Sequence, residues 1–229
     1  GLPLPQPFLA PLPTSQALLF FDNCAMMKLA ILDRDGTLNA LGDGAYIDTP
    51  EDWIALPGAL EAVARLNHAG WRVVVATNQP GLGRGVFDMA ALNAIHARMH
   101  KQLVAMGGRI DAVFYCPHAP NENCTCHKPG YALLEQICER YGVDPRNVPV
   151  VGNCANHLLA GAALGAPLRL VCTGRSALLN PKAPLEGDWP AGVQVHASLD
   201  AFVDHLLAAS TLPSAGSLAA ATGAAARTG

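Results

Sequence analysis

The chain has 229 residues, of which 51% are apolar and 14% charged, and its formal net charge is −3. This length and apolar content suffice for one well-buried core, so we expect one main domain. The chain has only 15 Lys and Arg residues and no dense basic run, so it lacks an electrostatic footprint for nucleic acid. No apolar stretch approaches the roughly 20 residues that cross a bilayer. We therefore expect a soluble protein that binds neither nucleic acid nor a membrane.

The two ends of the chain differ in composition from its middle. Residues 1–26 are rich in Pro, and their apolar patch at 17–21 lacks the basic leader of a secretion signal. Residues 211–229 are rich in Ala, Gly, Ser and Thr and hold few large apolar side chains. The expected organisation is an N-terminal extension without fixed structure (1–26), one folded domain (27–210) and a low-complexity tail (211–229).

Short apolar runs alternate with amphipathic stretches from residue 29 onward. The runs at 29–32, 72–76, 112–115, 148–151 and 168–171 predict strands, and the stretches at 58–69, 92–103, 133–141, 158–164 and 199–208 predict helices. This alternation is typical of an α/β fold, a doubly wound parallel sheet with helices on both faces. Ligands bind beyond the carboxyl ends of the strands in such sheets, so the residues after each strand are the candidates for chemistry.

Two carboxylates, Asp33 and Asp35, follow the first predicted strand in the segment DRDGT. A carboxylate can attack phosphorus and form an aspartyl-phosphate, while a second one protonates the leaving oxygen and later activates water. Because neighbouring anions repel an incoming phosphate, we expect Mg²⁺ to neutralise them. The alternative is an acidic turn or helix cap, which the pattern after an apolar strand disfavours.

The DRDGT segment resembles the nucleophile motif of the haloacid dehalogenase superfamily. That resemblance implies that Asp33 is the nucleophile and Asp35 the general acid and base. The second predicted strand ends in Thr77-Asn78-Gln79, which is similar to the superfamily's second motif, where a hydroxyl and backbone amides hold the phosphoryl oxygens. Thr77 takes that role by resemblance, unless this is an ordinary polar strand end. The glycine-rich stretch at 81–85 carries Arg84, which could approach a phosphosugar.

A loop after the third predicted strand gathers three of the seven cysteines, in the order Cys116, His118, Cys124 and Cys126. Three thiolates and one imidazole suit a closed tetrahedral Zn²⁺ site, which organises a loop too short to form its own core. The spacing favours a metal over disulfides and agrees with a reducing cytoplasm; the alternative is a cluster of free buried cysteines. Lys128, just beyond the loop, would stabilise the phosphoryl group in transit, unless it is a solvated surface lysine.

The motifs DRDGT, TNQ with GLGRG, CxHx5CxC and KP stand in the order and spacing of the D-glycero-D-manno-heptose 1,7-bisphosphate 7-phosphatases, relatives of the histidinol-phosphate phosphatases. The resemblance covers roughly residues 27–207. It implies a cytoplasmic monomer with almost no cap domain that removes the 7-phosphate of a heptose bisphosphate, on the way to nucleotide-activated heptose for the lipopolysaccharide core. It implies sugar contacts from Asn39 and from a loop that includes Asp43 and Tyr46. It also implies a phosphate pocket formed by Thr77, Asn78, Gln79 and Lys128.

The chain departs from the family pattern after its fourth predicted strand. The pattern there is Val-Gly-Asp with a second Asp four residues on, whereas this chain has Asn153 and His157. Asn153 still offers a neutral oxygen, so the expected Mg²⁺ ligands are Asp33, Asp35 and Asn153, with a lower affinity than three anionic groups would give. His157 is a poor substitute for an oxygen ligand.

Two further departures concern the phosphate pocket. His127 stands where the family has Arg before the motif lysine, so it would hold a sugar phosphate less firmly, and Pro80 replaces a Ser and lacks a backbone donor. A catalytically silent relative that binds a sugar phosphate or a protein is therefore the rival interpretation, and a histidinol-phosphate phosphatase is the alternative enzyme. His96 and His100 lie one helical turn apart without a third ligand, so we assign them no metal.

Overall fold

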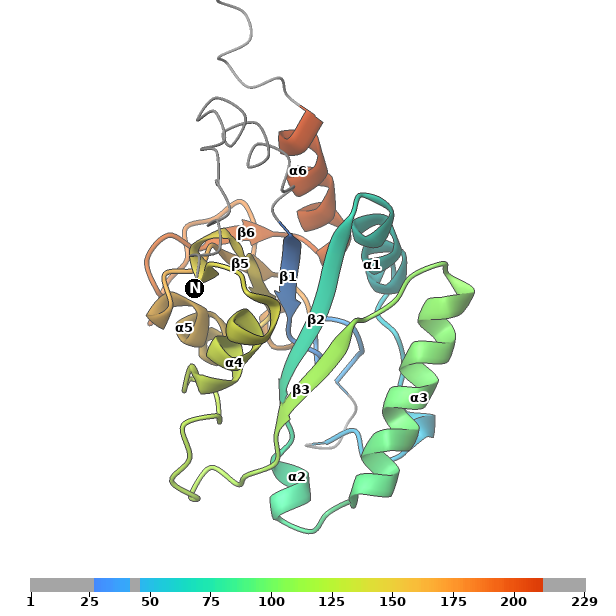
Figure 1. Cartoon of the computed structure of the whole chain (residues 1–229). Helices are drawn as coiled ribbons and strands as arrows, with labels where there is room; N and C mark the ends of the chain where they lie inside the picture. The colour runs from blue at the N-terminus through green and yellow to red at the C-terminus, as the bar shows by residue number, and fades with distance from the viewer. Residues whose placement is uncertain (1–26, 42–45, 212–229) are drawn as a thin grey trace, which may run out of the picture.

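The structure is a computed structural model of the whole chain, and it describes residues 27–41 and 46–211 (Figure 1). The expected extension at 1–26, the expected tail except its first residue, and Asp43 lie outside these ranges.

The centre of the molecule is one six-stranded parallel sheet. Its strands are β1 (Lys28–Leu32), β2 (Trp71–Asn78), β3 (Ala112–Cys116), β4 (Val150–Gly152), β5 (Leu168–Val171) and β6 (Gln194–His196). Their order is β3-β2-β1-β4-β5-β6, so the chain builds outward from β1 on one side and then returns to build outward from β4 on the other. The five predicted strands are confirmed. The three-residue β6 was not predicted, because it is too short to show a periodic pattern.

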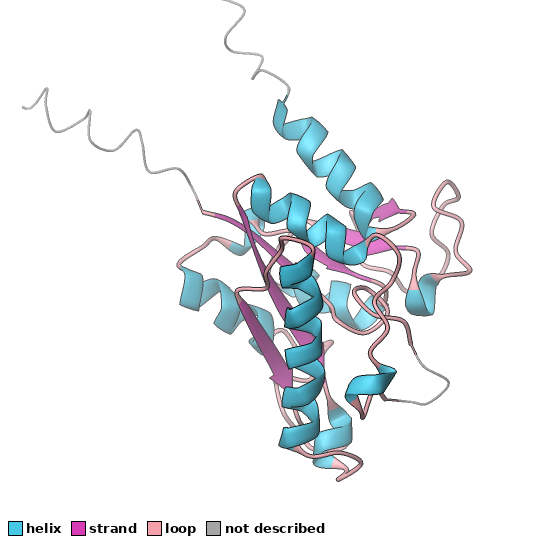
Figure 2. Ribbon diagram, turned by 90° about the vertical axis from the view of Figure 1, so that its right-hand side faces the viewer, coloured by secondary structure: helices cyan, strands magenta, loops and turns pink. Residues whose placement is uncertain are grey.

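Helices cover both faces of this sheet (Figures 1 and 2). The described helices are α1 (Ala59–His68), the short α2 (Pro80–Gly83), α3 (Met89–Ala105), α4 (Ala132–Tyr141), α5 (Ala155–Ala163) and α6 (Leu199–Thr211), with 3-10 turns at Pro50–Asp52, Pro145–Asn147 and Gly174–Ser176. Side chains of α1, α3 and α6 form one core with one face of the sheet, and those of α4 and α5 form a second core with the other. Since both faces are buried, the strands read as continuous apolar runs. The doubly wound fold is confirmed.

Alternate residues of β1 show how the two cores arise. Ala30 and Leu32 belong to the core under α1, α3 and α6, and Leu29 and Ile31 belong to the core under α4 and α5. Neighbouring side chains of a strand point to opposite faces, so a single five-residue strand contributes to both.

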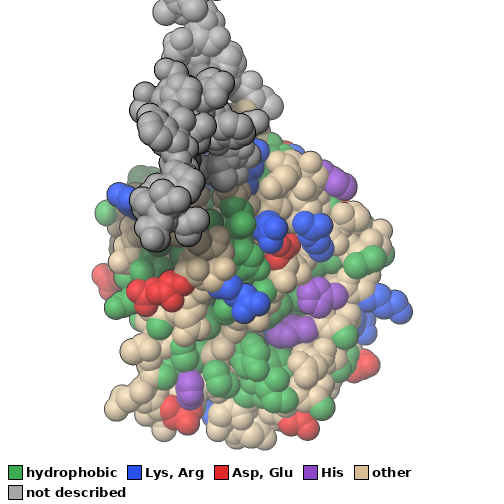
Figure 3. Space-filling view, viewed as in Figure 1, with side chains coloured by type: hydrophobic (Ala, Val, Ile, Leu, Met, Phe, Trp, Pro, Cys, Tyr) green, Lys and Arg blue, Asp and Glu red, His purple; other side chains and the backbone are tan. Residues whose placement is uncertain are grey.

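The described part of the segment between β1 and α1 holds one 3-10 turn and no separate domain, which matches the expectation of almost no cap. None of the helices in the described ranges is long and apolar enough to cross a membrane. On the face shown in Figure 3, Lys and Arg side chains lie in small groups among acidic, histidine and apolar side chains.

Candidate active site

The carboxyl ends of β1, β2 and β4 meet at the point where the winding of the sheet reverses. Leu32 of β1 pairs with Val75 of β2 on one side and with Val151 of β4 on the other. The residues just beyond these pairs therefore share one edge, as expected for a doubly wound sheet. A cavity of about 350 Å³ opens there, and its lining includes Asp33, Asp35, Thr77, Asn78, Gln79, Arg84, His127, Lys128, Asn153, Cys154 and Arg175.

The two carboxylate oxygens of Asp33 have different surroundings. Oδ1 accepts hydrogen bonds from Lys128 Nζ and from the Arg34 backbone N–H, each at 2.9 Å. The hydrogen-bonding neighbour of Oδ2 is the Cys154 thiol, whose sulfur lies 3.6 Å away. Burial alone would raise the pKa of Asp33, but the charge and hydrogen bond of Lys128 outweigh it and lower the pKa. Asp33 is thus an ionised carboxylate with one oxygen fixed and the other available for chemistry.

Asp35 is held by three side chains. The guanidinium of Arg34 donates to Oδ1 at 2.9 and 3.1 Å and to Oδ2 at 3.0 Å. Asn39 Nδ2 donates to Oδ1 at 3.1 Å, and Gln79 Nε2 donates to Oδ2 at 2.9 Å. The expectation that Asn39 faces a sugar is not met, because its side chain is fully buried and binds Asp35 and the Ala40 carbonyl instead.

Arg34 and His96 are contributors that sequence reasoning missed. The Arg34 side chain has no exposed surface, and its Nη1 lies 3.1 Å from Nε2 of His96 on α3. Burial, followed by the charge of Arg34, lowers the pKa of His96 to about 4, so the imidazole is neutral and its Nε2 accepts the hydrogen bond. The arginine inside DRDGT was visible in the sequence, but its partner on α3 lies 62 positions away.

Lys128 is buried beside Asp33, so the interpretation of it as a solvated surface lysine is wrong. Its ammonium group contacts Asp33 Oδ1 at 2.9 Å, the Ala76 carbonyl at 2.8 Å and His157 Nδ1 at 2.9 Å. Asn78 fixes the backbone of Lys128 from β2: its Oδ1 accepts from the Lys128 N–H at 3.0 Å, and its Nδ2 donates to the Lys128 carbonyl at 3.1 Å. The motif after β2 therefore positions the lysine as well as lining the cavity.

Asn153 follows β4 and is fixed by hydrogen bonds in three directions. Its Nδ2 donates to the Asp35 carbonyl at 2.7 Å and to Thr37 Oγ1 at 2.9 Å, and its Oδ1 accepts from the Arg175 backbone N–H at 3.1 Å. Gly36 makes room for this amide, because it has φ of +78° and a Cβ there would lie 2.6 Å from Asn153 Oδ1. The segment after β1 and the segment after β4 are thus joined through Asn153.

Three of the residues expected to contact the substrate, Tyr46, Arg84 and His127, line the cavity. Arg84 Nη1 donates to the Tyr46 hydroxyl at 2.8 Å, and both residues line the cavity. His127 also lines it, while its Nδ1 lies 3.8 Å from the Cys116 sulfur. Cys154 and Arg175 complete the lining, and sequence reasoning assigned neither of them a role. Cys154 directly follows Asn153, and this position in the sequence was the signal that could have identified it as a lining residue.

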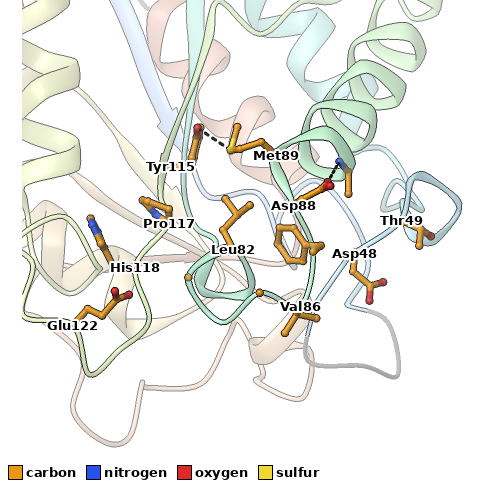
Figure 4. A pocket seen from close by; sticks show the side chains of 14 residues that line it. Asp48, Thr49, Leu82, Val86, Asp88, Met89, Tyr115, Pro117, His118 and Glu122 are labelled. Carbon is orange, nitrogen blue, oxygen red and sulfur yellow. Dashed lines mark hydrogen bonds between the residues drawn. The ribbon is translucent and has the colours of Figure 1, made fainter.

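A larger and more open hollow of about 920 Å³ lies beside this cavity (Figure 4). Leu82 and Val86 line it from the segment after β2, and Pro117 and His118 line it from the loop after β3. The described residues around it do not include Asp33, Asp35 or Lys128. The smaller cavity is therefore the one that holds the reactive groups.

The four predicted zinc ligands come together next to the cavity. The Sγ atoms of Cys116, Cys124 and Cys126 and a ring nitrogen of His118 all lie within 4.8 Å of one another. His118 Nδ1 is 3.5 Å from Cys116 Sγ and 3.3 Å from Cys126 Sγ, and Cys116 Sγ is 3.8 Å from Cys124 Sγ. The cluster joins the end of β3 to the segment that carries His127 and Lys128.

Comparisons with known proteins agree with this geometry. Residues 43–165 match the model of the haloacid dehalogenase-like hydrolases. A D-glycero-β-D-manno-heptose-1,7-bisphosphate 7-phosphatase of Bordetella bronchiseptica is 48% identical over 79% of this chain and 98% of the relative, and one of Pseudomonas putida is 46% identical over 65% of this chain and 85% of the relative.

Solved structures give the same result. The crystal structure of D,D-heptose 1,7-bisphosphate phosphatase from B. bronchiseptica, complexed with magnesium and phosphate, matches with a TM-score of 0.75 and 48% identity over 80% of this chain and 99% of that one. The corresponding structure from Burkholderia thailandensis matches with a TM-score of 0.60 and 46% identity over 79% of this chain and 98% of that one. With its carboxylates, lysine and fold in the arrangement described above, this chain belongs to the haloacid dehalogenase-like hydrolases and, within them, to the family of the D-glycero-D-manno-heptose 1,7-bisphosphate 7-phosphatases.

Proposed function

We propose that this protein is a cytoplasmic, monomeric phosphatase that hydrolyses the 7-phosphate of D-glycero-D-manno-heptose 1,7-bisphosphate, a step toward ADP-heptose for the lipopolysaccharide core. The observation that carries the proposal is the ion pair between Asp33 and Lys128, which fixes Oδ1 of the nucleophile and leaves Oδ2 at the cavity. A relative that bears this name and matches over 98% of its own length supports the choice of substrate.

In the proposed mechanism, Asp33 Oδ2 attacks the phosphorus of the 7-phosphate. The bond between Oδ2 and phosphorus forms, the bond from phosphorus to the sugar oxygen breaks, and Asp35 gives its proton to that oxygen. Asp35 then takes a proton from water, whose oxygen attacks phosphorus and releases inorganic phosphate and Asp33. Lys128 and the Thr77 hydroxyl stabilise the charge on the phosphoryl oxygens during both steps.

Mg²⁺ fits the oxygen atoms that the site offers. Asp33 Oδ2 is anionic, and the Asp35 backbone carbonyl accepts a hydrogen bond from Asn153 Nδ2 at 2.7 Å, so an electropositive group already faces that oxygen. Asp33 and the Asp35 carbonyl would hold the ion, and Asn153 would join them only through Oδ1, which in the structure accepts a hydrogen bond from the Arg175 backbone N–H. The ion would neutralise the approaching phosphate. The carboxylate of Asp35 accepts hydrogen bonds from Arg34, Asn39 and Gln79, so it would exchange one of these hydrogen bonds for a proton when it acts as acid or base.

A structural Zn²⁺ fits the cysteine cluster. Zinc at about 2.3 Å from sulfur and about 2.0 Å from nitrogen implies tetrahedral edges of roughly 3.5–3.8 Å. Four of the six corresponding edges here run from 3.2 to 3.8 Å, and all four ligand atoms lie within 4.8 Å of one another. Cys116, His118, Cys124 and Cys126 would hold the ion, and the loop between β3 and α4 would be organised by it.

The part of the substrate away from the reacting phosphate would lie at the mouth of the cavity. Arg84, Arg175 and His127 line it there, and Arg84 is oriented by its hydrogen bond to Tyr46. The two arginines supply the positive charge that a second phosphate group requires. Asp43, outside the described residues, belongs to the same proposed sugar loop.

The test is phosphate release from heptose 1,7-bisphosphate over a Mg²⁺ series, for the wild type and for Asp33→Asn and Asn153→Asp. Asp33→Asn removes the nucleophile and should abolish turnover. Asn153→Asp loses the N–H that faces the Asp35 carbonyl and gains an anion, so it should lower the Mg²⁺ concentration at half-maximal rate and increase the Mg²⁺-induced rise in melting temperature. A wild type that is inert at every Mg²⁺ concentration would overturn the proposal.

The second candidate function is a silent relative that binds a phosphate ester without turning it over. It is favoured by Asn153, whose neutral amide fills the place of a carboxylate and whose N–H is bonded to the Asp35 carbonyl. Binding without release of phosphate in the same titration would support it, especially if Asn153→Asp gains activity. A panel that contains histidinol phosphate separates the two enzymatic alternatives.

A further inference from the structure

His157 lies in the first turn of α5 and is fully buried against the reactive lysine. Its Nδ1 is 2.9 Å from Lys128 Nζ, so the ring nitrogen accepts a hydrogen bond from the ammonium group. Its Nε2 is buried without a hydrogen-bond partner among the described residues. Burial first, and then the charge of Lys128, lowers the pKa of His157 to about 3. The imidazole is neutral.

Gly152 provides the space for this ring. A Cβ at Gly152 would lie 2.7 Å from His157 Cδ2, so the last residue of β4 can hardly be anything larger. The position of the imidazole is therefore set by the end of β4 and by its hydrogen bond with Lys128.

The three donors of the Lys128 ammonium group are all used. They meet one anion, Asp33 Oδ1, and two neutral acceptors, the Ala76 carbonyl and His157 Nδ1. The buried group of Asp33, Lys128 and His157 thus has no net charge. A carboxylate at position 157 would share the charge of Lys128 between two anions and would leave the group with one negative charge, which would repel an incoming phosphate.

We propose that His157 is a positioning residue that orients Lys128 as a neutral acceptor, so that the charge of Lys128 can already attract a phosphoryl group before Mg²⁺ binds. Asn153 has the same effect on the charge of the cavity, because it is neutral where the family pattern has an Asp. The inference rests on the proposed function only in taking this cavity as a phosphate site, and it makes no assumption about the sugar.

The test compares inorganic phosphate binding by titration calorimetry in zinc-replete protein, with and without Mg²⁺, for the wild type, His157→Asn and His157→Asp. Asn and Asp have nearly the same shape, and Asn Oδ1 can accept from Lys128 as His Nδ1 does. Without Mg²⁺, His157→Asn should bind phosphate within about threefold of the wild type, and His157→Asp should bind it on the order of tenfold more weakly or worse. With saturating Mg²⁺ the difference in phosphate affinity between the two variants should become smaller.

Equal affinities of His157→Asn and His157→Asp without Mg²⁺ would overturn the inference, and so would a wild type that binds no phosphate without the ion. His157→Leu, which lacks an acceptor, should lower kcat more than it raises KM, since Lys128 acts on the phosphoryl group in transit. If His157→Leu fails to fold, the Asn and Asp pair still decides the matter, with melting temperatures as the folding control. If the affinities follow the expected order but the wild type hydrolyses no heptose bisphosphate, the proposed function fails and the inference about His157 stands.

Discussion

The guanidinium of Arg34 has no exposed surface. It donates hydrogen bonds to the Asp35 carboxylate and to the His96 imidazole. A buried cation without partners costs several kcal/mol, so Asp35 and His96 are needed for Arg34 to be there at all. Conversely, Arg34 fixes both oxygens of Asp35, the proposed general acid and base. The neutral state of His96 is part of this arrangement, because a protonated ring could not accept from Arg34.

Replacing His96 should therefore change the position of Asp35, because Arg34 contacts both residues. His96→Leu leaves Nη1 of Arg34 without its acceptor in a buried site, and we expect a loss of about 1–3 kcal/mol in the free energy of unfolding together with a lower kcat. His96→Gln keeps an oxygen near the position of Nε2 and should lose less of both. Urea denaturation and steady-state kinetics measure the two effects, and equal losses in the two variants would show that the hydrogen bond is irrelevant.

The sequence allowed the candidate catalytic residues that line the cavity to be singled out, but not all of the residues that contact them. Asp33, Asp35, Thr77 and Lys128 could be found because each directly follows a strand or a recognisable motif, and the parallel sheet brings such positions to one edge. His96 could not be connected to Arg34, since the contact depends on how α3 packs against the sheet. Asn39 was placed incorrectly for a related reason: its side chain turns inward to Asp35, and the sequence carries no signal for that direction.

At the scale of the elements, the loop between β3 and α4 links the proposed zinc site to the cavity. Cys116 ends β3, His127 lies 3.8 Å from its sulfur, and Lys128 follows directly. The backbone of Lys128 is also bonded to Asn78 of β2. The lysine is thus fixed from the sheet on one side and from the cysteine cluster on the other.

Loss of zinc should therefore weaken phosphate binding as well as stability. Cys124→Ser removes one proposed ligand, and we expect less than one zinc per chain by elemental analysis, a lower melting temperature and a raised Kd for inorganic phosphate. Cys172→Ser is the matched control, because Cys172 lies outside the cluster at the end of β5 and should leave zinc content and phosphate affinity unchanged. A full zinc content in Cys124→Ser would contradict the proposed ligand set.

For the whole molecule, the periodicity of the sequence was enough to predict the sheet and its class. Each of the five predicted strands had a continuous apolar run because both faces of the sheet are covered, and each long helix had an apolar stripe. The pattern could not tell which helix covers which face. That assignment follows from the reversal of the winding between β1 and β4, which puts α1, α3 and α6 on one side and α4 and α5 on the other.

Three histidines that are buried or half-buried in the folded protein are neutral there, and this predicts how stability depends on pH. Burial lowers the pKa of His157 to about 3 and of His96 and His196 to about 4, from an ordinary value of 6.5. In the unfolded chain these rings take up protons as the pH falls below 6.5, while in the folded protein they stay neutral. The unfolded state then binds more protons, so stability is complete above pH 6.5 and decreases as the pH falls toward 4.

Asp33 affects the pH dependence of stability only at lower pH. Its pKa is lowered from 3.8, so its stabilising contribution is lost below that value. Between pH 6.5 and 4.5 we therefore expect the free energy of unfolding, measured in urea at several pH values, to fall with a slope of up to one proton for each of these histidines. His157→Asn and His196→Asn should each reduce the slope, the first by more because His157 is fully buried and His196 is half-buried. Parallel slopes in all three proteins would mean that these rings are protonated in the folded state, which would also break the hydrogen bond that His157 accepts from Lys128.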